Sequence, residues 1–290
     1  MSKQWFYLVV SSILIISCEK KQENSVNKEI TVKTEDFSSN IAEKGNTIVS
    51  RFLPPKGYSW IESPKNSFGA FIENFELEKY GAPILKFNGR PLNIQNLHEA
   101  IFNIDVGKED LQQCADSVIR LYAEFLWKEK RFDEIQFQLT SGDIMSWKDF
   151  KNGIRPKING NNVTFSKTAE EDTSYSNFRK YLNLVFTYSG TISLNKETIA
   201  VKDNKSLKTG DIIITPGSPG HVVFIAGVAE NSENQRLYLL GEGFMPAQSI
   251  HILSNPFDKR LSPWYSLDVS SPEIHTARYL FKGHSFRTFR

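Results

Sequence analysis

One cysteine, one histidine and one glutamate have the types and surroundings in this sequence that suggest chemistry. Cys114 stands near the start of a segment with helical periodicity, His221 opens an apolar run behind the breaker cluster 216–220, and Glu242 ends a later apolar run. A thiolate is a nucleophile, an imidazole can take up and return its proton, and a carboxylate can fix the orientation of the imidazole. Together, the three side chains would suit acyl transfer through a thiol.

A helix must carry the cysteine. Apolar residues recur at spacings of three and four across 110–128, which predicts a helix with one wide apolar face. Asp110 followed by Gln113 fits a capping box, so we expect the helix to begin there, within one turn of Cys114. The helix N-terminus would then favour the thiolate.

A pair of antiparallel strands must carry the other two residues. We expect strands over 221–228 and 236–242, with opposed residue numbers that sum to about 465. On that register Val223 faces Glu242, and His221 lies one diagonal step away on the same face. A slip of one residue would separate the imidazole from the carboxylate.

The remaining periodicity predicts an α+β protein, because helices and strands are segregated along the chain. Neither a dinucleotide-binding GxGxxG motif nor a phosphate-binding GxxxxGK[ST] motif occurs. The other strands that we expect are 48–52, 83–87, 100–104, 135–139, 163–165, 211–215, 249–253 and one within 279–286, and the other helices are 67–75, one around Trp147 and 175–188.

The N-terminus indicates export. A cationic start at Lys3 and a short apolar stretch predict a signal peptide over 1–17. Its end, Ile-Ile-Ser-Cys, resembles the lipobox of bacterial lipoproteins, which implies a lipid anchor on Cys18. An uncleaved anchor or plain secretion is the alternative. The polar stretch 18–46 would be a flexible tether, followed by a single domain over 47–290 with its core in 105–290.

Composition sets further limits. The 290 residues are 40% hydrophobic and 12% aromatic, which is enough for a folded core. A net charge of +2 without basic runs argues against a nucleic-acid partner. We expect no metal and no cofactor, because His98, His251, His275 and His284 show no ligand spacing. Apart from Cys18, Cys114 is the only cysteine, so its thiol is either buried and inert or kept because it reacts.

Two resemblances bear on these residues. The segment LKTGDIIITPGSPGHVVFIAGVAEN is similar to the part of NlpC-type and CHAP-type cell-wall cysteine peptidases where a Gly-Asp turn precedes one strand and Gly-His opens the next. Over most of the mature chain, the lipobox, DLQQCADSVIRL, SPGHVVFIAGVAEN and LLGEGFMPAQSIHIL together resemble an uncharacterised domain-of-unknown-function family of bacterial lipoproteins.

The peptidase resemblance implies a papain-like core with an N-terminal elaboration, in which Cys114 is the nucleophile, His221 the base and Glu242 the third residue. The flanks depart from the Asp-Cys-Ser-Gly context of those enzymes, since Gln112 and Gln113 precede the cysteine. Gln112, Gln113 or the backbone N–H of Cys114 would stabilise the oxyanion.

These inferences predict a lipid-anchored protein of the bacterial envelope, on the periplasmic or surface face. Its activity would be that of a thiol hydrolase or amidase, with the membrane lipid as its anchor and peptidoglycan peptide as the candidate substrate. The alternative is a surface lipoprotein that keeps the fold for binding or structure without catalysis.

Overall fold

A large antiparallel sheet organises the residues that the computed structural model describes, which are 40–290. Residues 40–290 form one compact unit. The predicted signal peptide 1–17, the predicted anchor at Cys18 and most of the predicted tether 18–46 lie outside the described residues.

The sheet has the strand order β2-β11-β10-β9-β8-β15-β7, and β1 and β12 pair with β9 and β10 off this path. Three hairpins, β3–β4, β5–β6 and β13–β14, stand apart from it. The strands are β1 (Tyr58–Trp60), β2 (His98–Ile101), β3 (Gln136–Gln138), β4 (Ile144–Ser146), β5 (Ile154–Asn159), β6 (Asn162–Lys167), β7 (Ile199–Val201), β8 (Ile212–Thr215), β9 (His221–Asn231), β10 (Arg236–Glu242), β11 (His251–Leu253), β12 (Trp264–Tyr265), β13 (Glu273–His275), β14 (Leu280–Lys282) and β15 (Ser285–Thr288).

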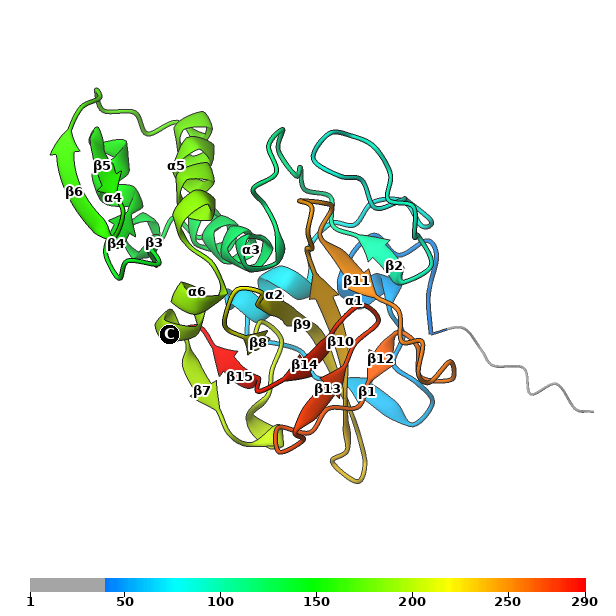
Figure 1. Cartoon of the computed structure of the whole chain (residues 1–290). Coiled ribbons are helices and arrows are strands. Elements are labelled where there is room, and N and C mark those ends of the chain that lie inside the picture. Colours follow the sequence, from blue (N-terminus) through cyan, green and yellow to red (C-terminus); the bar gives the residue numbers. More distant parts are fainter. Residues whose placement is uncertain (1–39) are drawn as a thin grey trace, which may run out of the picture. The chain divides into compact units, whose positions relative to one another are not determined.

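Helices cover one side of this sheet. The helices are α1 (Ile48–Arg51), α2 (Phe68–Glu73), α3 (Cys114–Lys128), α4 (Trp147–Lys151), α5 (Tyr175–Tyr188) and α6 (Thr191–Glu197), with short 3-10 turns at Phe132–Glu134 and Asn204–Ser206. Both α2 and α3 contact β9, and α5 lies beside α3 (Figure 1).

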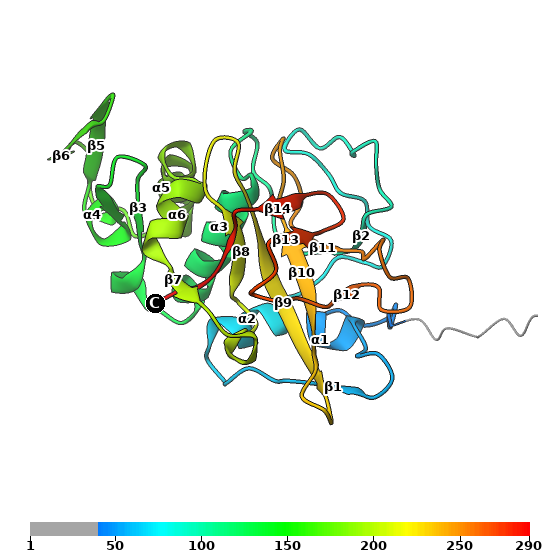
Figure 2. The same cartoon turned by 60° about the horizontal axis from the view of Figure 1, so that its bottom comes forward.

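The central strand β9 is buried on both faces, so its alternation separates two apolar cores. Val222 and Phe224 point into what we call the first core, together with the apolar face of α3. Val223 and Ile225 point into the second core, which the hairpin β13–β14 covers through Ile274. Figure 2 shows this hairpin over β10.

The predicted mixture of helices with a large antiparallel sheet is confirmed. Helix 175–188 and strand 236–242 have the predicted bounds. The strand predicted over 48–52 is wrong, because those residues form helix α1. Thr47 and Ser50 close a capping box at its start, and this local bonding overrides the β propensity of the apolar run.

The start of helix α3 also differs from the prediction. It begins at Cys114 with Gln113 as the N-cap residue, and Asp116 Oδ2 accepts the N–H of Gln113 at 3.1 Å. Asp110, which we expected at the cap, instead accepts the N–H of Ala247 at 2.6 Å. Cys114 is therefore the first residue of the helix.

The N-terminal part of the body joins the same sheet. Strand β1 pairs with β9, and β2 pairs with β11. The sheet is thus not confined to 105–290. Within the stretch that we assigned to the tether, Ile41 bridges to Phe52 and Asn40 donates to the carbonyl of Arg260 at 3.1 Å, so residues 40–46 belong to the folded body.

Candidate functional site

His221 and Glu242 form a buried pair on adjacent strands. The ring Nε2 of His221 lies 2.9 Å from Glu242 Oε2, and the two residues are 2% and 0% exposed. Because a carboxylate can only accept, the bond places the proton of a neutral imidazole on Nε2. The other nitrogen, Nδ1, then carries the lone pair that could accept a proton from a nucleophile.

A β-bulge makes this pairing possible. Near the hairpin loop, Leu237 pairs with Ala229 and Leu239 with Gly227. The register shifts by one residue after Leu239, so that Gly241 pairs with Phe224. The register at the site end is therefore the predicted one, although the loop end is displaced by one residue.

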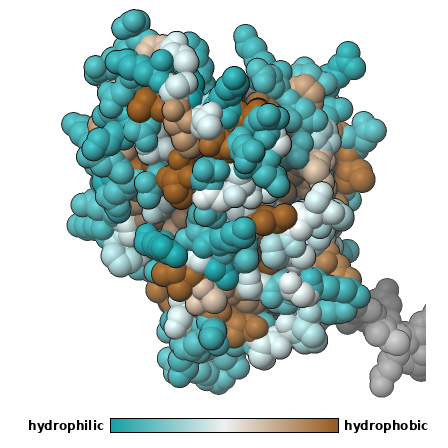
Figure 3. All heavy atoms as spheres, turned by 60° about the vertical axis from the view of Figure 1, so that its left-hand side comes forward, coloured by the Kyte–Doolittle hydropathy of each residue, from teal (hydrophilic) through white to brown (hydrophobic). Residues whose placement is uncertain are grey.

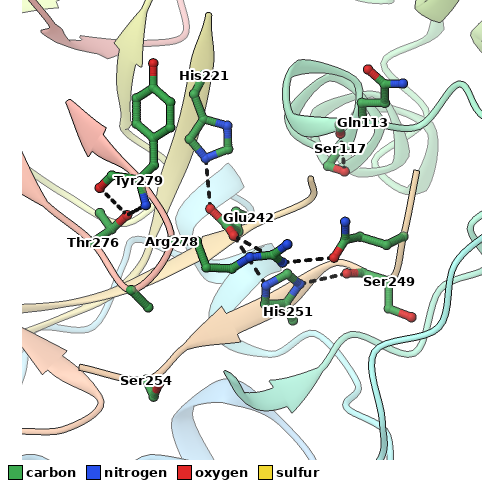
Figure 4. A network of polar contacts seen from close by, with 12 residues as sticks. Gln113, Ser117, His221, Glu242, Ser249, His251, Ser254, Thr276, Arg278 and Tyr279 are labelled. Carbon is green, nitrogen blue, oxygen red and sulfur yellow. Dashed lines mark hydrogen bonds and ion pairs between the residues drawn. The ribbon is translucent and has the colours of Figure 1, made fainter. Parts of the chain in front are cut away.

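Further positive and polar groups surround the carboxylate of Glu242. His251 Nε2 lies 3.5 Å from its Oε1, and Arg278 Nη1 lies 3.7 Å from the same oxygen. Ser249 O accepts from His251 Nδ1 at 2.8 Å, and Gln248 Oε1 accepts from Arg278 Nη1 at 2.9 Å. Figure 4 shows His221, His251 and Arg278 around Glu242.

The charge of Glu242 is stabilised by these neighbours. Burial by itself raises the pKa of a carboxyl group, but the hydrogen bond from His221 and the proximity of His251 outweigh it and lower the pKa of Glu242 to about 2. The group is therefore a carboxylate at neutral pH and can hold the ring of His221 in one tautomer.

Cys114 lies in a cleft at the N-terminus of α3. The cleft has a volume of about 300 Å³, and its opposite wall is the loop 217–220 that leads into His221. The cysteine is free and 7% exposed. Burial, followed by the charge of Asp116, raises the pKa of the thiol to about 11, so the resting side chain is a protonated thiol.

The thiol of Cys114 and the imidazole of His221 belong to different sides of β9. Cys114 packs in the first core, and the backbone of Val222, the residue after His221, acts to lower the pKa of its thiol against the larger effect of burial. The ring of His221 packs against Tyr279 and Phe281, which belong to the second-core side. No hydrogen bond joins the thiol to the imidazole within residues 40–290.

The two glutamines predicted as support differ in position. Gln113 lines the cleft, and its side chain donates to Asp110 at 3.1 Å. Gln112 does not line the cleft. Its side-chain oxygen accepts a hydrogen bond of 3.1 Å from Arg120, a residue within α3. Of the two, only Gln113 is placed to face a substrate.

Sequence reasoning missed two groups around Glu242. His251 is directly opposite Glu242 on β11, and Arg278 comes from the connection between β13 and β14. A register for β10 and β11 could have identified His251, but the long connection 243–250 does not fix one. No sequence pattern near Arg278 indicates that it lies beside Glu242.

Among residues 40–290, no group of three or more His, Cys, Asp or Glu side chains is arranged to hold a metal ion. In the same residues, none of the helices combines the length and the apolar character that crossing a bilayer requires. The surface shown in Figure 3 is largely hydrophilic, with apolar side chains in small separate patches.

The chain belongs to the family described as domain of unknown function 4846 (DUF4846), whose profile matches residues 48–288. This match covers nearly all of the described residues. No curated protein and no solved structure shows significant similarity to the chain.

Proposed function

We propose that this chain is an envelope lipoprotein whose domain is a papain-like thiol hydrolase or transferase acting on amide bonds. Cell-wall peptide is the substrate class that we favour, on the resemblance of 207–231 to cell-wall peptidases. The anchor would be lipid on Cys18, which would hold the domain at the membrane surface through the segment before residue 40.

One observation carries the proposal. A buried histidine, held in one tautomer by Glu242, is adjacent to the loop 217–220, which forms one wall of the cleft that contains the thiol of Cys114. A buried ion pair contributes little net free energy of folding compared with apolar packing. Stability alone therefore does not explain why this pair lies beside the cleft.

The chemistry follows from the hydrogen bonds. His221 Nδ1 would remove the proton of the Cys114 thiol, and the thiolate would attack the amide carbonyl. The resulting imidazolium would protonate the leaving amine as the C–N bond breaks, which leaves a thioester on Cys114. Water, deprotonated by the same nitrogen, would then hydrolyse the thioester and regenerate the thiol.

Each neighbour has a part in this cycle. Glu242 would stabilise the imidazolium through the bond to Nε2. The backbone N–H of Cys114, at the first position of α3, and the side chain of Gln113 are the donors available to the oxyanion. Because no hydrogen bond joins the thiol to the imidazole in this conformation, the cycle requires a second conformation, reached also without substrate, in which His221 and Cys114 approach hydrogen-bonding distance.

A non-catalytic binding role is the second candidate function. The observation that favours it is the burial of Cys114, whose thiol has a raised pKa and no bond to His221. A cysteine of this kind is inert in most folded proteins.

Alkylation of Cys114 against pH separates the two functions. Mass spectrometry of the peptide that contains Cys114 would follow its reaction with iodoacetamide, so that Cys18 does not contribute. For a catalytic pair we expect reactivity at neutral pH, below the pKa of about 8.5 of an ordinary thiol, and loss of that component in His221→Ala.

A matched control is His275→Ala, because His275 is exposed and far along the chain from the cleft. It should leave the profile unchanged. If Cys114 in the wild type reacts only at strongly alkaline pH and His221→Ala reacts in the same way, there is no activated nucleophile and the binding role stands.

A further inference from the structure

The cleft beside Cys114 is acidic. Its lining includes the carboxyl groups of Asp110 and Asp116, and neither lysine nor arginine occurs among the residues that line it. The proposed mechanism uses neither carboxyl group. Their hydrogen bonds show which of them is free to meet a ligand.

Asp110 is occupied within the protein. One of its oxygens, Oδ1, accepts the N–H of Ala247 at 2.6 Å and the side-chain amide of Gln113 at 3.1 Å. These bonds fasten the segment before α3 to the connection between β10 and β11. Asp110 therefore serves the structure of the cleft wall.

Only one oxygen of the Asp116 carboxyl group has a hydrogen-bond partner. Its Oδ2 accepts the N–H of Gln113 at 3.1 Å, while its Oδ1 is buried and has no hydrogen-bond partner. The residue is 7% exposed and lines the cleft two positions after Cys114. An unsatisfied buried carboxylate oxygen costs free energy, so it needs an explanation.

No group of the opposite wall, 217–220, donates a hydrogen bond to this oxygen. The N–H of Gly217 donates to Thr191 Oγ1 at 3.2 Å, and Pro219 has no N–H. Without a donor, burial raises the pKa of Asp116 to about 8. A cation placed at Oδ1 would satisfy the oxygen and restore the carboxylate.

We infer that the cleft binds a primary ammonium group of the substrate, with Asp116 Oδ1 as its acceptor, beside the thiol of Cys114. This inference rests on the proposed function and specifies its substrate as a peptide with a free amino group near the scissile amide. An ammonium group fits because it is a compact donor that carries the charge complementary to Asp116.

Charged thiol reagents test the inference without any assay of catalysis. Cationic aminoethyl methanethiosulfonate and anionic sulfonatoethyl methanethiosulfonate would be compared by their rates at Cys114, again by peptide mass spectrometry. For each protein, the rate with the cationic reagent is divided by the rate with the anionic reagent, and this ratio is normalised to the same ratio for a free model thiol. At about pH 8.5, where Asp116 is ionised, we expect a cationic preference of about tenfold in the wild type and of about twofold or less in Asp116→Asn.

Asp133→Asn is the matched control. It makes the same charge change at an exposed aspartate outside the cleft, and it should keep the cationic preference. A ratio that Asp116→Asn leaves unchanged would overturn the inference. Failure of both reagents to reach Cys114 would do so as well, because a cleft that admits an ammonium group to the thiol must admit them.

A second measurement avoids substitution, in case Asp116→Asn does not fold. Alanyl-alanine amide should slow the modification of wild-type Cys114 by either reagent, whereas its N-acetyl form should not. Equal protection by the two dipeptides would contradict the inference. The proposed function fails by a different result, namely an alkylation profile of Cys114 that does not depend on His221.

Discussion

The hydrogen bond of 2.9 Å between His221 and Glu242 exists because of a β-bulge between their strands. On the hairpin-loop side of the bulge, the numbers of two paired residues add up to one more than on the other side, as the pairs Leu239–Gly227 and Leu240–Ile225 show. Had the first register continued, the side chain of Glu242 would have shared a face with Phe224 and pointed away from His221.

The first prediction concerns the acid stability that Glu242 provides. Its pKa is lowered from 4.5 to about 2, so its contribution is present above the unfolded-state pKa and is lost as pH falls through about 2. The wild type should exceed Glu242→Gln in free energy of unfolding by roughly 3 kcal/mol above about pH 5. Urea unfolding at a series of pH values measures this difference.

The difference should shrink as pH falls, because a protonated glutamate resembles glutamine. Glu233→Gln, at an exposed position, serves as the control and should show no such trend. A difference between wild type and Glu242→Gln that stays constant down to about pH 2 would mean that Glu242 is not ionised in the folded protein.

The second prediction concerns Asp116 and has the opposite sign. Its pKa is raised to about 8, so its contribution to stability is present below the unfolded-state pKa and is lost as pH rises through about 8. Between about pH 5 and pH 9, the free energy of unfolding should therefore fall less for Asp116→Asn than for the wild type. The two decreases should differ by a few kcal/mol, with about 5 kcal/mol as an upper bound.

Thermal or urea unfolding of both proteins at these pH values provides the measurement. Asp133→Asn should follow the wild type, since Asp133 is exposed. Parallel pH profiles for Asp116→Asn and the wild type would show that Asp116 is ionised in the empty cleft.

The third prediction concerns the contact that holds α3 against the end of β10. A Cβ on Gly243 would lie 1.9 Å from Ser117 Oγ and 2.9 Å from the carbonyl oxygen of Gln113. Gly243→Ala should therefore destabilise the protein by about 1–3 kcal/mol and displace the first turn of α3. Chemical denaturation measures the first effect, and the alkylation rate of Cys114 measures the second.

Gly190→Ala is the paired control, because a Cβ there would meet no atom within 4 Å. It should change the stability by less than about 0.5 kcal/mol. If Gly243→Ala were equally harmless, the first turn of α3 would not be packed against Gly243 as the structure places it.

Local patterns predicted the elements that make up this protein. The helix 175–188 and the strand 236–242 were predicted with their bounds, because each has a clear apolar period between polar ends. Patterns were less reliable where a side chain could bond to the backbone. Thr47 caps the apolar run 48–51 as helix α1, and the carboxyl group of Asp116, which accepts the N–H of Gln113, sets the start of α3 at Cys114.

By itself, therefore, the sequence determined the periodic elements, the thiol at a helix start and the histidine at a strand start. Only the tertiary structure decided how these groups face one another. The bulge in β9 aligned His221 with Glu242, and the two cores placed Cys114 and His221 on different sides of that strand. Arg278, from a distant segment of the chain, lies beside the carboxylate of Glu242. These relations depend on strand register and on long-range packing, which local sequence periods do not encode.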